Sequence, residues 1–406
     1  MDPTVLYALR DPAGLPFYPL VFTLLGVLTF ALHIFAVQLM LGASALTMIG
    51  AFRSDANWRR LAAAMLDVAK IAVSVAIVIG VAPLLFVQVT YDPFWYSSNV
   101  LSARWVIYFI LILIAGYWAM YLYYFKNRGL PPQQTPRLRW AMPVSVVLLL
   151  VVGFIMHVLT YQMLYPEQWM QWYAPGGRLD TSGSGLHAYN PWRFLFFIAM
   201  AAPVVGAWLL AYRRYFAVRS DADQNYLEWA AGLGVRLMQY GTPVVILLGG
   251  LWMASLPEKV AAFAVSPWVW ASLIALLATL AAAFWLRGRV RSGCYLPVVA
   301  LVVVGLVIAA AREALRYAVL YGVHRYDILD YKLNLDWYST VLFFGTFAVV
   351  GGTVLAYLLT VAWRAGQTEG VYTPSPAVQR MGVLSIALIV LWIVQYFAIG
   401  FVVWAR

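Results

Sequence analysis

The chain has 406 residues, of which 64% are hydrophobic and only 11% are charged. A soluble domain of this size cannot bury so much apolar surface, so the composition excludes a soluble globular protein and predicts an integral membrane protein in contact with lipid. The net charge of +11 is typical, in such a chain, of basic loops beside a membrane and does not indicate nucleic-acid binding.

The chain contains ten apolar runs of the length needed to cross a bilayer, which is about 20 residues. We therefore predict an all-α, polytopic transmembrane bundle of about ten spans that forms a single membrane domain over residues 1–406. The first run has no basic leader or cleavage site, so we expect it to be retained as a span. The runs lie near residues 17–51, 62–90, 102–125, 141–165, 192–216, 233–256, 266–286, 295–322, 337–363 and 381–404.

The basic residues alternate from loop to loop. Sixteen of the 27 Lys and Arg residues fall in every second loop or beside it. The positive-inside rule places these loops in the cytoplasm and, with an even number of spans, places both termini outside. The sixteen are Arg53, Arg59, Arg60, Lys126, Arg128, Arg137, Arg139, Arg213, Arg214, Arg219, Arg236, Arg287, Arg289, Arg291, Arg364 and Arg380.

Two of the four histidines fall inside predicted spans. His33 lies in the first span and His157 in the fourth, while His187 and His324 fall in predicted outer loops. A buried imidazole needs a partner, and we interpret His33 and His157 as the axial ligands of a haem iron. The alternatives are a hydrogen bond to a neighbouring helix, a role in a proton path, or methionine as the second iron ligand. Because Cys294 is the single cysteine, any haem is non-covalent.

Arginines gather near the predicted outer ends of the spans. Arg104 opens the third span, Arg193 opens the fifth, and Arg312 and Arg316 flank Glu313 in the eighth. Guanidinium groups bind carboxylates bidentately, so Arg104, Arg312 and Arg316 are candidates to hold the two haem propionates. Each of them has the alternative of snorkelling to the interface or pairing with Glu313. Near the other end of the second span, Asp67 and Lys70 are spaced as a local ion pair.

The first half of the chain also resembles a known family. The segment 30–42, which reads FALHIFAVQLMLG, resembles the first transmembrane helix of subunit I of the cytochrome bd quinol oxidases. The segments 80–98 and 165–171 are similar to that family's second helix with its following loop and to the end of its fourth helix. The resemblance covers roughly the first 200 residues and implies that His33 is an axial haem ligand.

Other positions depart from the family pattern. Ala199 stands where the family has its second haem-ligand histidine, and the second span has Leu84, Leu85 and Gln88 in place of acidic residues. The family's large outer quinol loop is not found either. Oxygen reduction by a three-haem enzyme is therefore not expected, and a diverged subunit with one haem b fits the sequence better.

These observations lead to one leading hypothesis and two rivals. The leading hypothesis is a haem b subunit of a quinol-linked oxidoreductase in the bacterial inner membrane. It would pass electrons between quinone and a periplasmic partner, such as a c-type cytochrome or another redox subunit, within a multi-subunit complex. The first rival is a haem-free, quinone-binding membrane anchor of a respiratory complex. The second is a secondary transporter, for which two related halves with broken helices would be expected.

Overall fold

The computed structural model describes residues 3–131, 134–288 and 293–405 of the chain. Over these ranges the protein is all-α, and ten helices are long and apolar enough to cross a membrane. The predicted fold class is thereby confirmed. Two of the basic residues used to assign sidedness, Arg289 and Arg291, lie outside the described residues.

Several of the spans contain a break or a short segment of a different helix type. The spanning elements are α2 (Pro19–Ala51), α3 (Ala56–Thr90), α5 (Ala103–Asn127), α6 (Ala141–Gln162), α8 (Pro191–Ala199) with α9 (Ala201–Phe216), α10 (Gln224–Ala254), α11 (Pro267–Leu286), α12 (Leu296–Tyr317) with η5 (Ala318–Val323), α13 (Trp337–Gly345) with η6 (Thr346–Gly351) and α14 (Gly352–Gln367), and α15 (Pro376–Trp404). The short helices between them are α1 (Pro3–Ala8), α4 (Asp92–Val100), η1 (Pro166–Gln168), α7 (Trp169–Tyr173), η2 (Pro175–Gly177) and η3 (Glu258–Val265).

Local sequence signals set where several helices begin. The side chains of Asp55, Asn190, Asp223 and Asp336 each accept a hydrogen bond from the backbone N–H three residues later, at the starts of α3, α8, α10 and α13. Such N-caps satisfy one of the N–H groups that have no partner inside the helix. Proline occupies one of the first two helical positions of α2, α8, α11, α12 and α15, where its missing N–H costs nothing.

The helices α9 and α10 approach each other closely through small residues. A Cβ added at Gly206 would lie 2.6 Å from the carbonyl oxygen of Gly234, and one at Gly234 would lie 2.5 Å from that of Gly206. Between α2 and α9, a Cβ at Gly42 would come within 2.6 Å of Val205. Small residues let helix backbones pack tightly in lipid, where the hydrophobic effect does not hold helices together. These contacts fix the frame that surrounds the cavity described below.

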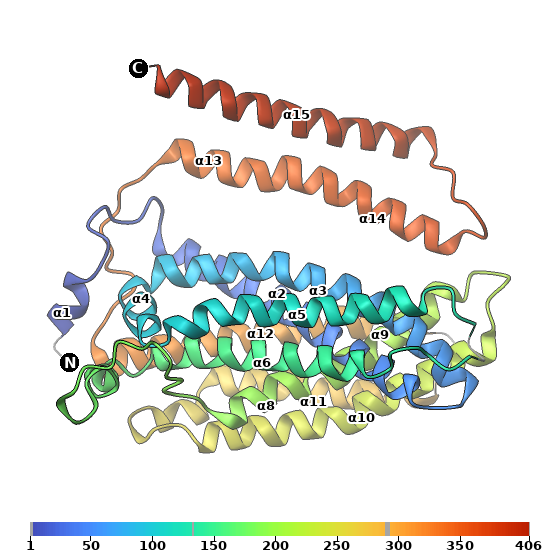
Figure 1. Cartoon of the computed structure of the whole chain (residues 1–406), viewed down its shortest axis with the longest axis horizontal. Helices are drawn as coiled ribbons and strands as arrows, with labels where there is room; N and C mark the ends of the chain where they lie inside the picture. Colours follow the sequence, from blue (N-terminus) through green and yellow to red (C-terminus); the bar gives the residue numbers. More distant parts are fainter. Residues whose placement is uncertain (1–2, 132–133, 289–292, 406) are drawn as a thin grey trace.

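The last two spans stand apart from the rest of the bundle. Figure 1 shows α13, α14 and α15 as a separate layer beside the other helices. Aromatic contacts connect this layer to the body near its two ends, where Phe17 meets Trp337 at 5.6 Å and Tyr215 meets Trp363 at 5.0 Å between ring centroids. The candidate site is therefore formed by the helices before residue 324.

Both termini lie at the end of the bundle that carries α1 and α4 (Figure 1). At this end the N-terminal segment is joined to the segment after η5, because the Leu15 N–H donates to the Lys332 carbonyl at 2.9 Å. Arg10 strengthens the junction, since its guanidinium lies 4.1 Å from the centroid of the Tyr331 ring and donates to the Tyr326 hydroxyl at 2.9 Å. We call this region, made of residues 3–18, 91–102, 163–190 and 317–336, the cap.

Candidate functional site

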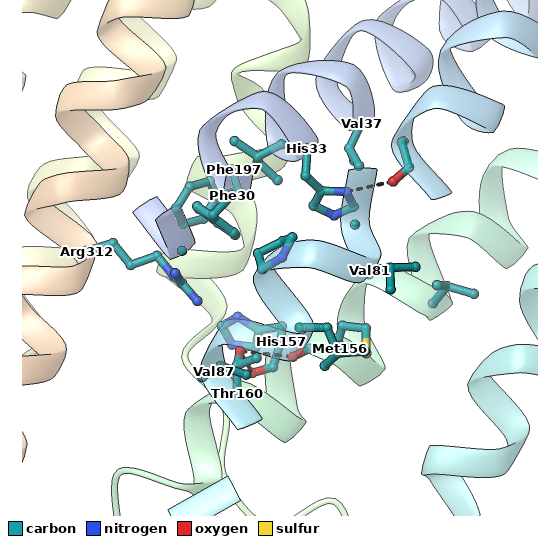
Figure 2. Close-up of a pocket in the computed structure, with 18 of the residues that line it drawn as sticks. Phe30, His33, Val37, Val81, Val87, Met156, His157, Thr160, Phe197 and Arg312 are labelled. Atoms are coloured by element: carbon teal, nitrogen blue, oxygen red, sulfur yellow. Dashed lines mark hydrogen bonds between the residues drawn. The ribbon is translucent and has the colours of Figure 1, made fainter. Parts of the chain in front are cut away.

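A cavity of about 380 Å³ opens in the middle of the bundle between α2, α3, α5, α6, α8 and α12. Its volume falls within the range of ligand pockets, about 300–1,000 Å³. Most of its wall is apolar, and Figure 2 shows His33, His157 and Arg312 reaching into it from three different helices. The ionisable side chains on its wall, apart from Tyr91, are His33, His157, Arg193, Arg312, Glu313 and Arg316.

His33 is held by one ring nitrogen only. Its Nδ1 lies 2.9 Å from the Ala76 carbonyl oxygen of α3 and therefore carries the proton and donates it. Its Nε2 has no protein hydrogen bond within the described ranges. An imidazole whose second nitrogen donates to a backbone carbonyl has the orientation and tautomer that metal-binding histidines adopt.

Gly80 makes this placement of His33 possible. A Cβ at Gly80 would lie only 2.7 Å from the His33 ring, and real Cβ atoms do not come so close to ring atoms. The Nδ1–Cε1 edge of the imidazole thus lies against the bare backbone of α3. On the other side of the cavity, Gly153 of α6 is also part of the wall, and a Cβ there would meet nothing nearer than Phe194 at 3.8 Å.

His157 lies in the same cavity but in different surroundings. The backbone N–H of Asn190 donates to its Nε2 at 3.0 Å, and Nη1 of Arg193 lies 2.8 Å from its Nδ1. A neutral imidazole can accept through only one of its nitrogens. Both nitrogens of His157 face N–H groups, so neither is free toward the cavity, and the ring accepts a hydrogen bond from only one of the two. His157 could bind a metal only if Asn190 moved away from Nε2 or Arg193 moved away from Nδ1.

The arginines give the cavity an excess of positive charge. Arg316 pairs with Glu313 at 2.9 Å, whereas Arg312 lies 4.0 Å from the same carboxylate and stacks at 3.9 Å from the centroid of the Phe30 ring. The Tyr91 hydroxyl also donates to Glu313. The buried Nε of Arg312 has no hydrogen-bond partner in the described part of the chain. With Arg193, the wall carries three guanidinium groups and one carboxylate.

A buried charge without a partner is costly. Two positive charges in excess therefore favour a ligand with two negative charges, or two monoanions.

The structure brings four of the five sequence-predicted site residues to this cavity: His33, His157, Arg312 and Arg316. Arg104 is exposed at the start of α5, where its backbone N–H donates to Gly183, and it does not line the cavity. From the sequence, Arg193 was only one of the arginines near the outer ends of the spans. The structure places it in the cavity wall as the third guanidinium.

The remaining histidines lie in the cap, outside the cavity. His187 stacks on Trp172 with ring centroids 5.0 Å apart, and His324 lies 3.5 Å from Glu167. Among the described residues, no three His, Cys, Asp or Glu side chains gather as a metal site.

An aromatic cluster of the cap lies against one end of the cavity. Phe94, Trp169 and Tyr326 pack together there with Val87 and Tyr91, and the last two also line the cavity wall. Asp92 lies beside the cluster and accepts hydrogen bonds from the Asp11 N–H at 2.9 Å and from the Tyr331 hydroxyl. Partial burial raises the pKa of the Asp92 carboxyl to about 6. The cap thus packs against this end of the cavity and contains a carboxyl whose pKa is raised to about 6.

Comparisons with known proteins do not assign the chain. A scan against models of known protein families finds no match. A search of curated protein sequences finds none either.

Proposed function

We propose that the cavity holds one non-covalent haem b and that the protein is an electron-transfer subunit of a membrane oxidoreductase. His33 is the proposed axial ligand, through Nε2. Arg312 and Arg316, joined by Arg193, are the proposed partners of the two propionates. Bound haem would supply one-electron chemistry at its iron, while the protein sets its potential through ligand type, burial and nearby charge.

The observation that carries this proposal is the charge balance around His33. Three guanidinium groups and one carboxylate leave two positive charges, and haem brings two propionates. The same cavity offers a ring nitrogen held at the correct tautomer by Ala76 and given space by Gly80. An anion without a metal would balance the charge of the arginines, but it would leave the His33 Nε2 without a bonding partner.

His157 fits this proposal less well than His33. Both of its nitrogens are engaged, Nε2 by the Asn190 N–H and Nδ1 by the Arg193 guanidinium, which lies 2.8 Å away in the cavity wall. We therefore assign His157 to positioning Arg193 and propose His33 as the only protein ligand of the iron. A haem of this kind keeps an open coordination position, so the reduced protein is expected to bind carbon monoxide.

The proposed electron partners follow from the membrane location and the sequence resemblance. We propose the bacterial inner membrane, quinone or quinol as the lipid-soluble partner, and a periplasmic c-type cytochrome or another redox subunit as the second. The cap is the proposed outer face, because the basic loops lie at the other end of the spans. Whether the complex completes a catalytic reaction depends on the subunits that join this chain.

Redox difference spectroscopy of the purified protein tests the proposal. We expect haem b bands in the wild type, loss of these bands in His33→Ala, and their retention in His187→Ala, a histidine outside the cavity. In His157→Ala the iron ligation is expected to be unchanged, with weaker haem retention because Arg193 loses its anchor.

Two results would contradict the assignment of ligands. Low-spin haem that becomes high-spin on His157→Ala would show that both histidines bind the iron. Protein that folds and yet carries no haem would remove the haem proposal, and a quinone headgroup would then be the next occupant to test against the same arginines.

A further inference from the structure

At the end of the bundle with the basic loops, one loop carries exposed cations beside exposed apolar side chains. Residues 126–140, where α5 ends and the chain turns into α6, contain four basic residues and no Asp or Glu. The four are Lys126, Arg128, Arg137 and Arg139. All are exposed, and none pairs with a carboxylate in the described part of the chain. Because the loop joins two spans, these positive charges lie at the membrane surface.

The backbone of this loop is strained at Leu138. Its φ of 47° lies in the left-handed region, which is unfavourable for a residue that carries a side chain. Asn127 fixes the residue before it, because its side chain donates to the Arg137 carbonyl at 2.9 Å and accepts from the Arg137 N–H at 2.7 Å. Glycine would adopt this conformation without strain, yet a leucine with 53% of its surface exposed occupies the position. The loop thus displays an apolar side chain between two arginines at a cost in stability.

Aromatic side chains lie beside these arginines. The Trp140 ring is 67% exposed and contacts Phe52, at the end of α2, with ring centroids 4.9 Å apart. The Arg139 guanidinium lies 5.0 Å from the centroid of the same Phe52 ring. Tryptophan collects at the level of the lipid headgroups, because its ring is apolar and its N–H is polar. We call Phe52, Arg137, Leu138, Arg139 and Trp140 the loop patch.

The apolar part of the loop patch continues along one face of α6. Val144, Val147 and Val151 follow Trp140 at steps of four, three and four residues, so they share its side of the helix. All three valines are exposed. A molecule that matches this surface has a negatively charged head and long apolar chains. A soluble anion would meet the arginines but would leave Leu138 and the valine face uncovered.

We propose that the loop patch binds the headgroup of an anionic phospholipid, whose acyl chains lie along the valine face of α6. Arg137 and Arg139 are assigned to the phosphate, and Leu138 and Trp140 to the boundary between headgroup and chains. The site selects lipids with a net negative charge, because basic groups at a membrane surface attract such headgroups. It lies at the opposite end of the bundle from the cap and does not depend on what the cavity holds.

Native mass spectrometry of the delipidated, full-length protein in detergent tests this proposal. The probes are phosphatidylglycerol, which is anionic, and phosphatidylcholine, which is zwitterionic, and the affinity of the first bound lipid is measured for each. We expect the wild type to bind phosphatidylglycerol more tightly. The double variant Arg137→Gln/Arg139→Gln is expected to bind it roughly 25-fold more weakly, about 5-fold for each basic residue at a membrane surface, and to bind phosphatidylcholine as the wild type does.

The matched control is the double variant Arg364→Gln/Arg380→Gln. It removes two exposed arginines from α14 and α15 at the same end of the bundle (Figure 1). It is expected to leave both lipid affinities unchanged, because neither arginine belongs to the loop patch.

Leu138→Gly separates the geometry of the loop patch from its charge. The variant keeps both arginines and relieves the strained φ, so it is expected to remain folded, which thermal unfolding of the same sample checks. Phosphatidylglycerol should bind roughly 4- to 12-fold more weakly, the effect of losing half of a leucine side chain from the lipid contact. An unchanged affinity would overturn the choice of a lipid as the occupant.

Three further results would overturn the proposal. Equal affinities of the wild type for the two lipids would show that the loop patch does not select charge. Equal losses in the two double variants would assign binding to the overall positive charge of this end. Displacement of phosphatidylglycerol by an equal concentration of glycerol 3-phosphate, which carries the charge without acyl chains, would assign the site to a free phosphate.

Discussion

The two polar regions of the bundle differ in how their charges are balanced. Toward the end with the basic loops, Lys70 on α3 meets Asp67 at 2.6 Å, and the nearby Ser74 and Tyr117 are neutral hydroxyl-bearing side chains. In the cavity wall the one carboxylate, Glu313, is accompanied by three arginines. A buried polar group alone therefore does not indicate a bound ligand. A buried charge without a partner does, and it also indicates the sign of the ligand's charge.

The largest effect is expected from removing one of the excess positive charges of the cavity. Arg312→Leu takes away a guanidinium that has no close carboxylate partner. The loss of a charged hydrogen bond is worth about 1.5–3 kcal/mol, so haem affinity is expected to fall roughly 10- to 150-fold. Haem titration of depleted protein in detergent measures the change.

Arg104→Leu is the control for that experiment, because Arg104 is exposed and lies outside the cavity. It is expected to leave haem affinity unchanged. An equal loss in both variants would mean that the general positive charge of the protein, and not the cavity arginines, holds the ligand.

A second variant tests the geometry of the site while leaving its charges in place. Gly80→Ala puts a methyl group 2.7 Å from the present position of the His33 ring and should break the hydrogen bond to Ala76. Overpacking of this kind costs about 1–3 kcal/mol, so haem should bind roughly 5- to 150-fold more weakly. Gly232→Ala, where the new Cβ meets nothing within 4 Å, is the matched control. Unchanged haem spectra in Gly80→Ala would show that His33 does not need its present position.

The smallest expected effect concerns the cap and the pH. Because the pKa of Asp92 is raised to about 6 in the folded protein, the folded state holds a proton between pH 4 and 6 that the unfolded chain releases. The contribution of Asp92 to stability is therefore greatest at low pH and is lost as the pH rises through 6.

Thermal unfolding at pH 5 and pH 7 measures this contribution. In Asp92→Asn the stability difference between the two pH values should shrink by roughly 1 kcal/mol, after allowance for solvent screening of a half-exposed group. Asp180→Asn, in an exposed loop of the cap, should not reduce this difference in stability between pH 5 and pH 7. An unchanged difference in Asp92→Asn would mean that this carboxyl is ionised throughout the range.

The sequence predicted the spans well because each is a long apolar run, and its Asp67 and Lys70 pair is confirmed at 2.6 Å. It also placed His33 and His157 as possible neighbours, since both interrupt apolar helices. It could not predict that both nitrogens of His157 are engaged, because Asn190 and Arg193 come from another helix.

Arg104 and Gly80 show a further limit of the sequence. Arg104 and Arg193 each stand at the start of a span, and the sequence does not say which way each one points around its helix. The structure exposes Arg104 and buries Arg193. The role of Gly80 depends on a ring that comes from α2, so only the packing of α2 on α3 reveals it.

A cryo-electron microscopy map of the purified protein in lipid nanodiscs tests the central claim most directly. We predict flat density with a strong central peak in the cavity, bonded to the Nε2 atom of His33 and with its two carboxylates at Arg312 and Arg316. A well-resolved cavity that contains only an acyl chain, a quinone or solvent would contradict the account.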